Sequence, residues 1–220
     1  MSTQRSVGHT AEQTLDPYAH MKASVMATKA EKSAETRRTI IDVAREVFAR
    51  DGFADASLAE IVARADVTTG AVYHHFGGKK GLFIAVAEHL EQVILGEVVR
   101  NASPSAVTWE ALEAGVANTL EICARPDIQR IVFREAPTVA GPTEWREIEM
   151  KYAFGLMRQA VVQLAEQGAI DAPNADLTAQ ILLGAIVEAA HGVALAQDKA
   201  GALRQGKATV RRMLRALKSD

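Results

Sequence analysis

Residues 57–82 constrain the fold more tightly than any other part of the chain, because they combine two short helical patterns with a three-residue turn. Ser57 is a favourable N-cap and Glu60 follows three residues later, so this segment predicts a capping box that begins a helix. Residues 65–67 are expected to form the turn, and Thr68 to cap the second helix. The inner face of the first helix has Leu58, Ile61 and Val62, and the second helix carries Thr69, Gly70, Tyr73, His74 and His75 outward. This pattern is a helix-turn-helix.

The chain is expected to have three parts. Residues 1–33 are polar and lack periodicity, which predicts a disordered extension. Residues 34–81 predict a three-helix domain that contains the helix-turn-helix. Its first helix has an apolar stripe that ends at Asp51 and Gly52, where glycine takes a left-handed conformation. A longer helix over residues 79–101 then joins this domain to the rest of residues 82–220.

The remaining chain predicts five more helices, because proline and glycine separate its apolar periodic segments. Their approximate limits are 108–124, 127–135 (stopping before Pro137), 143–167, 176–197 and 202–218. No segment alternates as a strand would. The fold class is therefore all-α, with an N-terminal helix-turn-helix domain, a connector helix and a C-terminal helical domain.

The segment ARADVTTGAVYHHFGGKKGLF resembles the TetR family of bacterial transcriptional repressors, whose typical run is close to AGVTTGALYHHFGSKEGLF. One position departs from that run. Asp66 stands where the family usually has glycine, at a turn position where φ is expected to be positive. Aspartate tolerates this conformation at modest cost, so the fold is expected to survive. The resemblance implies a DNA-binding regulator, a homodimer and a ligand-binding C-terminal domain.

The second helix of the motif is expected to enter the major groove of double-stranded DNA. Thr69, Ala71 and His74 are the candidate base readers. Phosphates are expected to meet the amides near Thr68 and three side chains, Tyr73, His75 and Lys79, while Gly70 allows close backbone approach. Ser57 is counted with this DNA-facing set. Val72 and Phe76 are interpreted as core residues instead.

The resemblance further implies a cavity for a small hydrophobic ligand, enclosed by the helices after the connector. Candidate wall residues are large apolar and aromatic side chains, which suit an adaptable pocket, although ordinary core packing is an equal alternative for each. They are Trp109, Ile122, Phe133, Met150, Phe154, Met157 and Leu183. Glu188 and His191 are polar residues in an otherwise apolar helix, and they either orient a ligand or meet an interface or solvent.

The resemblance also implies that the last two helices pair with their copies in an isologous dimer. A series of small residues on the first of these helices would permit close approach. The expected contact residues are Gly184, Ala185, Ala189, Ala190, Gly192 and Ala194, followed by Val210, Met213, Leu214 and Leu217. The operator is then expected to be nearly palindromic.

Charge and composition exclude several other classes. The formal net charge is −2, so positive charge is only local, around the motif. Cys123 is the single cysteine, which excludes a disulfide within the chain and a cysteine-based zinc site. No cofactor, metal site, membrane span or signal peptide is expected, which favours a cytoplasmic protein.

Two other functions compete with a ligand-released repressor. A di-iron helical enzyme would need a second Glu-x-x-His pair beside Glu188 and His191, and none exists, so we do not expect an enzyme. A DNA-binding adaptor that responds to a protein partner instead of a small ligand stays open. A cavity of a few hundred Å³ in the C-terminal domain would separate the two.

Overall fold

The computed structural model describes residues 19–101 and 107–219, and the all-α prediction is confirmed. Within these residues the only β-type pairing is one isolated bridge between Ile170 and Lys218. Among these residues, those up to 38 and those from 39 onward belong to two separate units. Helix α1 (Ala19–Asp55) begins in the first unit and ends in the second.

Helix α1 begins inside the segment for which disorder was predicted, residues 1–33. The chain is helical from Ala19 and not from Ala34. The physical reason is local, because residues 19–38 contain no proline or glycine and are rich in Ala, Lys, Glu, Met and Arg, which favour helix without an apolar stripe. The part of the prediction that concerns residues 1–18 lies outside the described residues.

The helix-turn-helix domain surrounds a small apolar core. It consists of the end of α1, α2 (Leu58–Arg64), α3 (Thr69–Phe76) and the start of α4 (Lys79–Asn101). Three aromatic rings stack edge to face in this core: Phe83 lies 4.9 Å from Phe48 and 5.2 Å from Phe53, measured between ring centroids. Ile61 and Val72, from α2 and α3, are fully buried in the same core. The end of α1 and helix α3 therefore pack on the first turns of α4, and α2 packs on α3.

The predicted caps and turn of the motif are confirmed. Ser57 Oγ accepts a hydrogen bond from the Glu60 amide at 3.2 Å, and Thr68 Oγ1 accepts one from the Ala71 amide at 3.2 Å. The Glu60 carboxylate, however, contacts Arg50 on α1 at 2.7 Å and so ties α2 to α1. Asp66 has φ 52°, the only positive φ outside glycine in the described residues. The departure from glycine is thus accommodated in the left-handed region.

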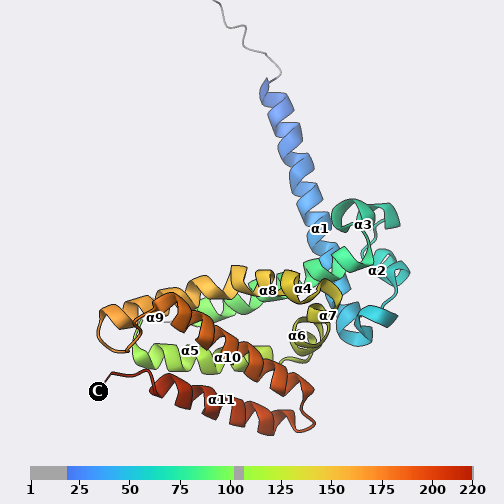
Figure 1. Ribbon diagram of the computed structural model, residues 1–220. Helices are drawn as coiled ribbons and strands as arrows, with labels where there is room; N and C mark the ends of the chain where they lie inside the picture. The colour runs from blue at the N-terminus through green and yellow to red at the C-terminus, as the bar shows by residue number, and fades with distance from the viewer. Residues whose placement is uncertain (1–18, 102–106, 220) are drawn as a thin grey trace, which may run out of the picture. The chain divides into compact units, whose positions relative to one another are not determined.

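The C-terminal domain consists of helices that follow each other with few breaks. They are α5 (Trp109–Cys123), α6 (Pro126–Ile128), η1 (Gln129–Glu135), α7 (Ala136–Ala140), α8 (Pro142–Glu149), η2 (Met150–Phe154), α9 (Gly155–Glu166), α10 (Ala175–Leu195) and α11 (Lys199–Arg215). Figure 1 shows α10 and α11 side by side as an antiparallel pair, with α5 beside them. Helix α10 also packs on α9 and η1.

Two segments, η1 and η2, have π-type turns, which the sequence analysis did not anticipate. The predicted helix end before Pro137 is wrong, because the chain stays helical from Pro126 to Ala140. Proline has no amide hydrogen and its ring crowds the carbonyl four residues back. Here the wider π turns of η1 directly precede the proline segment in place of regular α turns. The helix therefore changes form instead of stopping.

In the part of the chain that the structure describes, α10 alone is long and apolar enough to pass as a membrane span by length and composition. A core helix passes the same test, so this is weak evidence. Helix α10 packs against α5, α9, η1 and α11 and buries residues such as Leu182 and Ile186 among them. These contacts are those of a core helix.

Candidate DNA-binding surface and ligand cavity

One side of α3 is open to solvent. Thr69, Gly70 and His74 are exposed, and the Tyr73 side chain is 59% exposed although it is large and aromatic. A methyl group added at Gly70 would contact nothing closer than Thr68 Oγ1 at 3.7 Å, so packing within the protein does not require glycine there. The opposite side of α3 is in the core, where Val72 is fully buried. The predicted outer side of α3 is confirmed for Thr69, Gly70, Tyr73 and His74, and the predicted core position for Val72.

The two histidines have different surroundings. His75 is half-buried, and its ring lies 5.1 Å from that of His74 and 6.0 Å from that of Phe76. Phe76 itself is half-buried and packs against the core, as expected. Ala71 is half-buried near the start of the helix. His74 is therefore the more exposed of the two imidazoles.

Lys79 has a partner within the protein. Its Nζ donates a hydrogen bond to the Ala54 carbonyl at 2.9 Å and lies 5.2 Å from the centre of the Phe53 ring. It thereby caps the end of α1. Lys80 is exposed and has no hydrogen bond or ion pair with any described residue. The prediction of Lys79 as a phosphate ligand rested on its place at the start of the next helix and on the family resemblance.

The turn between α3 and α4 depends on glycine. Gly77 ends α3 in the left-handed conformation with φ 73°, and Gly78 has φ 120°. A Cβ at Gly81 would lie 1.8 Å from the carbonyl oxygen of Phe76, so no side chain fits there. This close approach fixes the position of α3 on α4 and was not foreseen.

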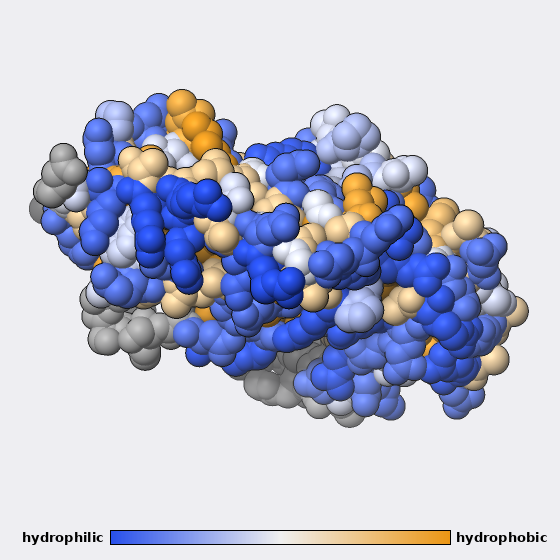
Figure 2. Space-filling model, turned by 90° about the horizontal axis from the view of Figure 1, so that it is seen from below, coloured by the Kyte–Doolittle hydropathy of each residue, from blue (hydrophilic) through white to orange (hydrophobic). Residues whose placement is uncertain are grey.

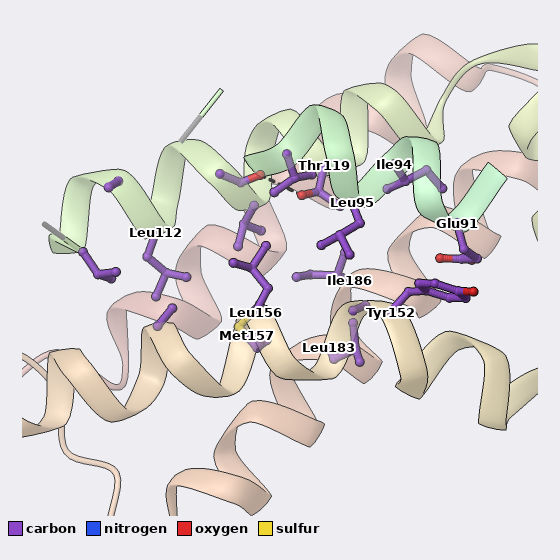
Figure 3. A pocket seen from close by; sticks show the side chains of 17 residues that line it. Glu91, Ile94, Leu95, Leu112, Thr119, Tyr152, Leu156, Met157, Leu183 and Ile186 are labelled. Atoms are coloured by element: carbon purple, nitrogen blue, oxygen red, sulfur yellow. Dashed lines mark hydrogen bonds between the residues drawn. The ribbon is translucent and has the colours of Figure 1, made fainter. Parts of the chain in front are cut away.

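A partly open cavity of about 170 Å³ lies between α4, α5, η2, α9 and α10. Figure 3 shows its wall, which is almost entirely apolar and contains several small residues. The cavity is smaller than the few hundred Å³ expected. It is close to the roughly 150 Å³ of an engineered protein cavity that binds benzene.

Only two of the predicted wall residues, Met157 and Leu183, line this cavity. The others lie elsewhere. Trp109, Ile122 and Phe133 are buried in the core, whereas Met150 and Phe154 are half-buried on η2 without reaching the cavity. His191 packs edge to face on Phe133 at 5.2 Å, and Glu188 is exposed.

Part of the cavity wall consists of small residues that were not predicted as wall residues. Ala111, Gly115, Ala153 and Ala160 contribute to the wall, and the remaining apolar wall residues include Ile94, Leu95, Leu112, Leu156 and Ile186. The wall also has three polar side chains, Glu91, Thr119 and Tyr152. Glu91 lies on α4, the helix whose first turns belong to the core of the helix-turn-helix domain.

A cluster of ionic contacts, which we call the α1 clamp, joins the C-terminal domain to the end of α1. It consists of Asp127, Arg130 and Glu135. Arg130 Nη1 donates to the carbonyls of Ala49 and Arg50 at 3.1 and 2.6 Å, and Glu135 Oε2 accepts from the Phe53 amide at 2.6 Å. Asp127 accepts a 2.9 Å hydrogen bond from Arg45 Nε.

The predicted dimer contacts divide into two groups. Ala190, Ala194, Val210 and Leu214 are buried within the chain and unavailable to a partner. The other predicted contacts are exposed or half-buried: Gly184, Ala185, Ala189, Gly192, Met213 and Leu217. Large apolar side chains that were not predicted as contacts are exposed at Leu177, Ile181 and Leu195. Figure 2 views the molecule from the side on which α11 lies in Figure 1 and shows separate hydrophobic areas among hydrophilic residues.

The fold and the open side of α3 define a DNA-binding regulator of the helix-turn-helix class. Family models add a more specific result: the model of bacterial regulatory proteins of the tetR family matches residues 40–86, and that of the tetracyclin repressor-like C-terminal domain matches residues 109–217. The chain belongs to the TetR family of transcriptional regulators, which are not enzymes.

Individual relatives agree. The HTH-type transcriptional repressor BepR of Brucella suis is 30% identical over 175 residues, which are 72% of this chain and 80% of BepR. The crystal structure of a TetR-family regulator of Pectobacterium atrosepticum is 33% identical, with TM-score 0.76 over 86% of this chain and 97% of that one. SmeT of Stenotrophomonas maltophilia, solved with triclosan, shares the fold at 24% identity, with TM-score 0.64 over 84% and 93%.

Proposed function

We propose that the protein is a homodimeric cytoplasmic repressor that leaves its operator when a small, mainly apolar molecule occupies the cavity. The observation that carries this proposal is the position of α4. Its first turns hold Leu82 and Phe83 in the core of the helix-turn-helix domain, and its later turns hold Ile94 and Leu95 in the cavity wall. Helix α3 packs against α4. A ligand that moves α4 would therefore also move α3.

For the DNA contact we retain Thr69, Ala71 and His74 as base readers and Tyr73 and His75 as phosphate ligands. Lys80 replaces Lys79 in the phosphate set, because the Lys79 ammonium is bonded to the protein. The amides at the start of α3, near Thr68, complete the set. Ser57 acts through its cap of α2.

We assign the dimer contact to one stripe of α10. Leu177, Ile181, Gly184, Glu188 and Leu195 follow each other at helical spacing and are exposed or half-buried. Exposed isoleucine and leucine in one stripe are typical of a surface that another subunit covers. This assignment gives Glu188 an interface role and removes it from the ligand set.

The α1 clamp provides a second connection between ligand and DNA. Segment η1 packs on α10, and α10 lines the cavity through Leu183 and Ile186. A shift of α10 would move Arg130 and Glu135 and, with them, the end of α1. Ligand and DNA would then oppose each other with a coupling free energy of about 1–3 kcal/mol.

The test begins with DNA selected from a random pool by the purified protein. Selected fragments should be near-palindromes with half-site centres about 34 Å, or a multiple of it, apart. His74→Ala should relax the preference at one base position by about 1–3 kcal/mol. Sequence preference that survives in His74→Ala unchanged would contradict the base-reading role.

The dimer is tested with Ile181→Arg, which should give monomers that lose DNA binding. Gln159→Arg, at an exposed position of α9, is the matched control and should remain dimeric. Sedimentation velocity distinguishes these results. A dimeric Ile181→Arg protein would place the interface elsewhere.

The ligand site is tested by filling it. Gly115→Leu adds a large side chain where nothing lies within 4 Å of the added Cβ, so it should occupy the cavity and block release of DNA. A thermal-shift screen with single-ring apolar compounds should find stabilisers of the wild type and none that act on Gly115→Leu. If no compound stabilises the wild type, regulation by a protein partner becomes the better explanation.

A further inference from the structure

The three polar side chains of the cavity wall differ in how their hydrogen-bonding capacity is used. Thr119 Oγ1 donates to the Gly115 carbonyl at 2.8 Å. The Tyr152 hydroxyl donates to Glu88 Oε1 at 2.7 Å and accepts from Gln92 Nε2 at 2.9 Å. Glu91 has no hydrogen bond or ion pair with any residue that the structure describes. Among the polar side chains of the wall, Glu91 is therefore the one whose hydrogen-bonding capacity is not taken up by a described residue.

Glu91 is also deeply placed. Its residue is only 8% exposed, and Figure 3 shows its side chain extending from α4 beside Tyr152 at one end of the cavity. A carboxyl group that is buried to this degree ordinarily has a partner. The cavity wall contains no lysine, arginine or histidine that could act as one.

The nearby cations are already paired with other carboxylates. Lys151 Nζ contacts Glu88 at 2.8 Å, and Arg146 Nη1 contacts Glu149 at 3.6 Å. Glu149 adds negative charge on the side of α8. Burial first, and then the charge of Glu149, raise the pKa of Glu91 to about 8. The surroundings of Glu91 therefore favour a bound proton, or another cation, at its carboxyl group.

We propose that the ligand of this cavity carries a protonated amine, which pairs with the Glu91 carboxylate while its apolar part packs against the cavity wall. The inference rests on the proposed function, because it names the chemical class of ligand for the same cavity. A buried ion pair of this kind satisfies a group that is otherwise left without a partner, and hydrogen bonds to charged groups are the stronger ones. A ligand with a carboxylate would find no basic residue in the cavity wall to pair with.

The volume of the cavity limits the apolar part. About 170 Å³ is below the roughly 300–1,000 Å³ of sites for drug-sized molecules. It suits one substituted ring. The wall beside Glu91 has Ile94 on α4 and Ile186 on α10, so the ring would lie between these helices.

Three probes of one skeleton separate charge from shape: 4-isopropylbenzylamine, 4-isopropylbenzyl alcohol and 4-isopropylbenzoate. Their dissociation constants are measured by calorimetry with the full-length wild type, Glu91→Gln and Glu110→Gln. Glu110 is an exposed residue of α5 outside the cavity wall, so its variant controls for the loss of one negative charge.

The wild type should bind the amine at least about tenfold more tightly than the alcohol and the benzoate most weakly. Glu91→Gln should abolish the preference for the amine and keep the affinity for the alcohol, whereas Glu110→Gln should behave as wild type. Equal affinity of wild type for amine and alcohol would overturn the role of Glu91 and leave the cavity as a ligand site. Failure of all three probes to bind the wild type would overturn the proposed ligand site as well.

A second readout needs no variant. The titratable groups around Glu91 are Glu149 on α8, Tyr152 on η2 and Cys123 on α5, while α10 contributes apolar residues to the wall. Because the amine replaces a proton on Glu91, its binding at neutral pH should release protons to the buffer, and its affinity should rise with pH up to about 8. Amine binding without proton release would contradict the pairing.

Discussion

Glu91 should make the protein less stable as the pH rises through the neutral range. Its pKa is raised from 4.5 to about 8 in the folded protein, mainly by burial. Below pH 4.5 both the folded and the unfolded chain carry the proton. Between these values only the folded chain keeps it, so every added pH unit favours unfolding by up to about 1.4 kcal/mol.

The magnitude follows from the two pKa values. Between about pH 5 and pH 7 the unfolded carboxyl is mostly ionised and the folded one mostly protonated, so this group lowers the free energy of unfolding by about 2.5 kcal/mol. The stabilisation is complete below pH 4.5 and is lost by about pH 8. Glu149 contributes in the same direction, because burial raises its pKa too.

Urea unfolding of wild type, Glu91→Gln and the surface control Glu110→Gln, each from pH 5 to 8, measures this effect. Protein concentration is held constant because the stability of a dimer depends on it. Glu91→Gln should have a much flatter pH dependence than the other two and should be the most stable of the three at pH 8. Parallel curves for wild type and Glu91→Gln would refute the reasoning, since Glu91 would then titrate alike in both states.

Three other predictions concern the helix-turn-helix domain and the buried thiol. Gly81→Ala should lower the free energy of unfolding by at least about 1 kcal/mol and weaken DNA binding, whereas Gly96→Ala, in the same helix with open space around the new Cβ, should raise it by about 0.5–1 kcal/mol. In a plot of the logarithm of the DNA-binding constant against the logarithm of the salt concentration, Lys80→Ala should reduce the slope by about 1. Lys79→Ala should lower thermal stability and leave this slope unchanged. Burial, then the nearby Glu91, raise the pKa of the Cys123 thiol, so iodoacetamide should alkylate it only in urea.

The helix-turn-helix segment was predictable because its determinants are local. Ser57 and Thr68 act on amides three residues away, and the positive φ of Asp66 follows from the turn that these caps enclose. The solvent-exposed side of α3 follows from helical periodicity alone. What periodicity could not decide was the partner of Lys79, because Ala54 and Phe53 reach it only through the tertiary fold.

The cavity could not be predicted because its determinants are not local: they depend on which helices face each other. Large residues such as Trp109 and Phe133 were natural candidates for a pocket wall, yet large side chains fill space and these two are buried in the core. Small residues such as Gly115 and Ala160 leave space, but the sequence does not say which helix faces them. Glu91 did carry a sequence signal, since it interrupts the apolar stripe of the connector.

The α1 clamp sets a limit on how this protein can be divided. Arg130 and Glu135 satisfy the last carbonyls of the α1 helix before Gly52 and the Phe53 amide. A fragment that ends after α4 would lose these charged partners and leave the backbone groups to water. The end of α1 is therefore held by a segment that is distant in sequence, residues 126–135. A hybrid regulator that joins this operator specificity to another sensor domain should carry both segments, or replace the clamp with an equivalent pair of side chains.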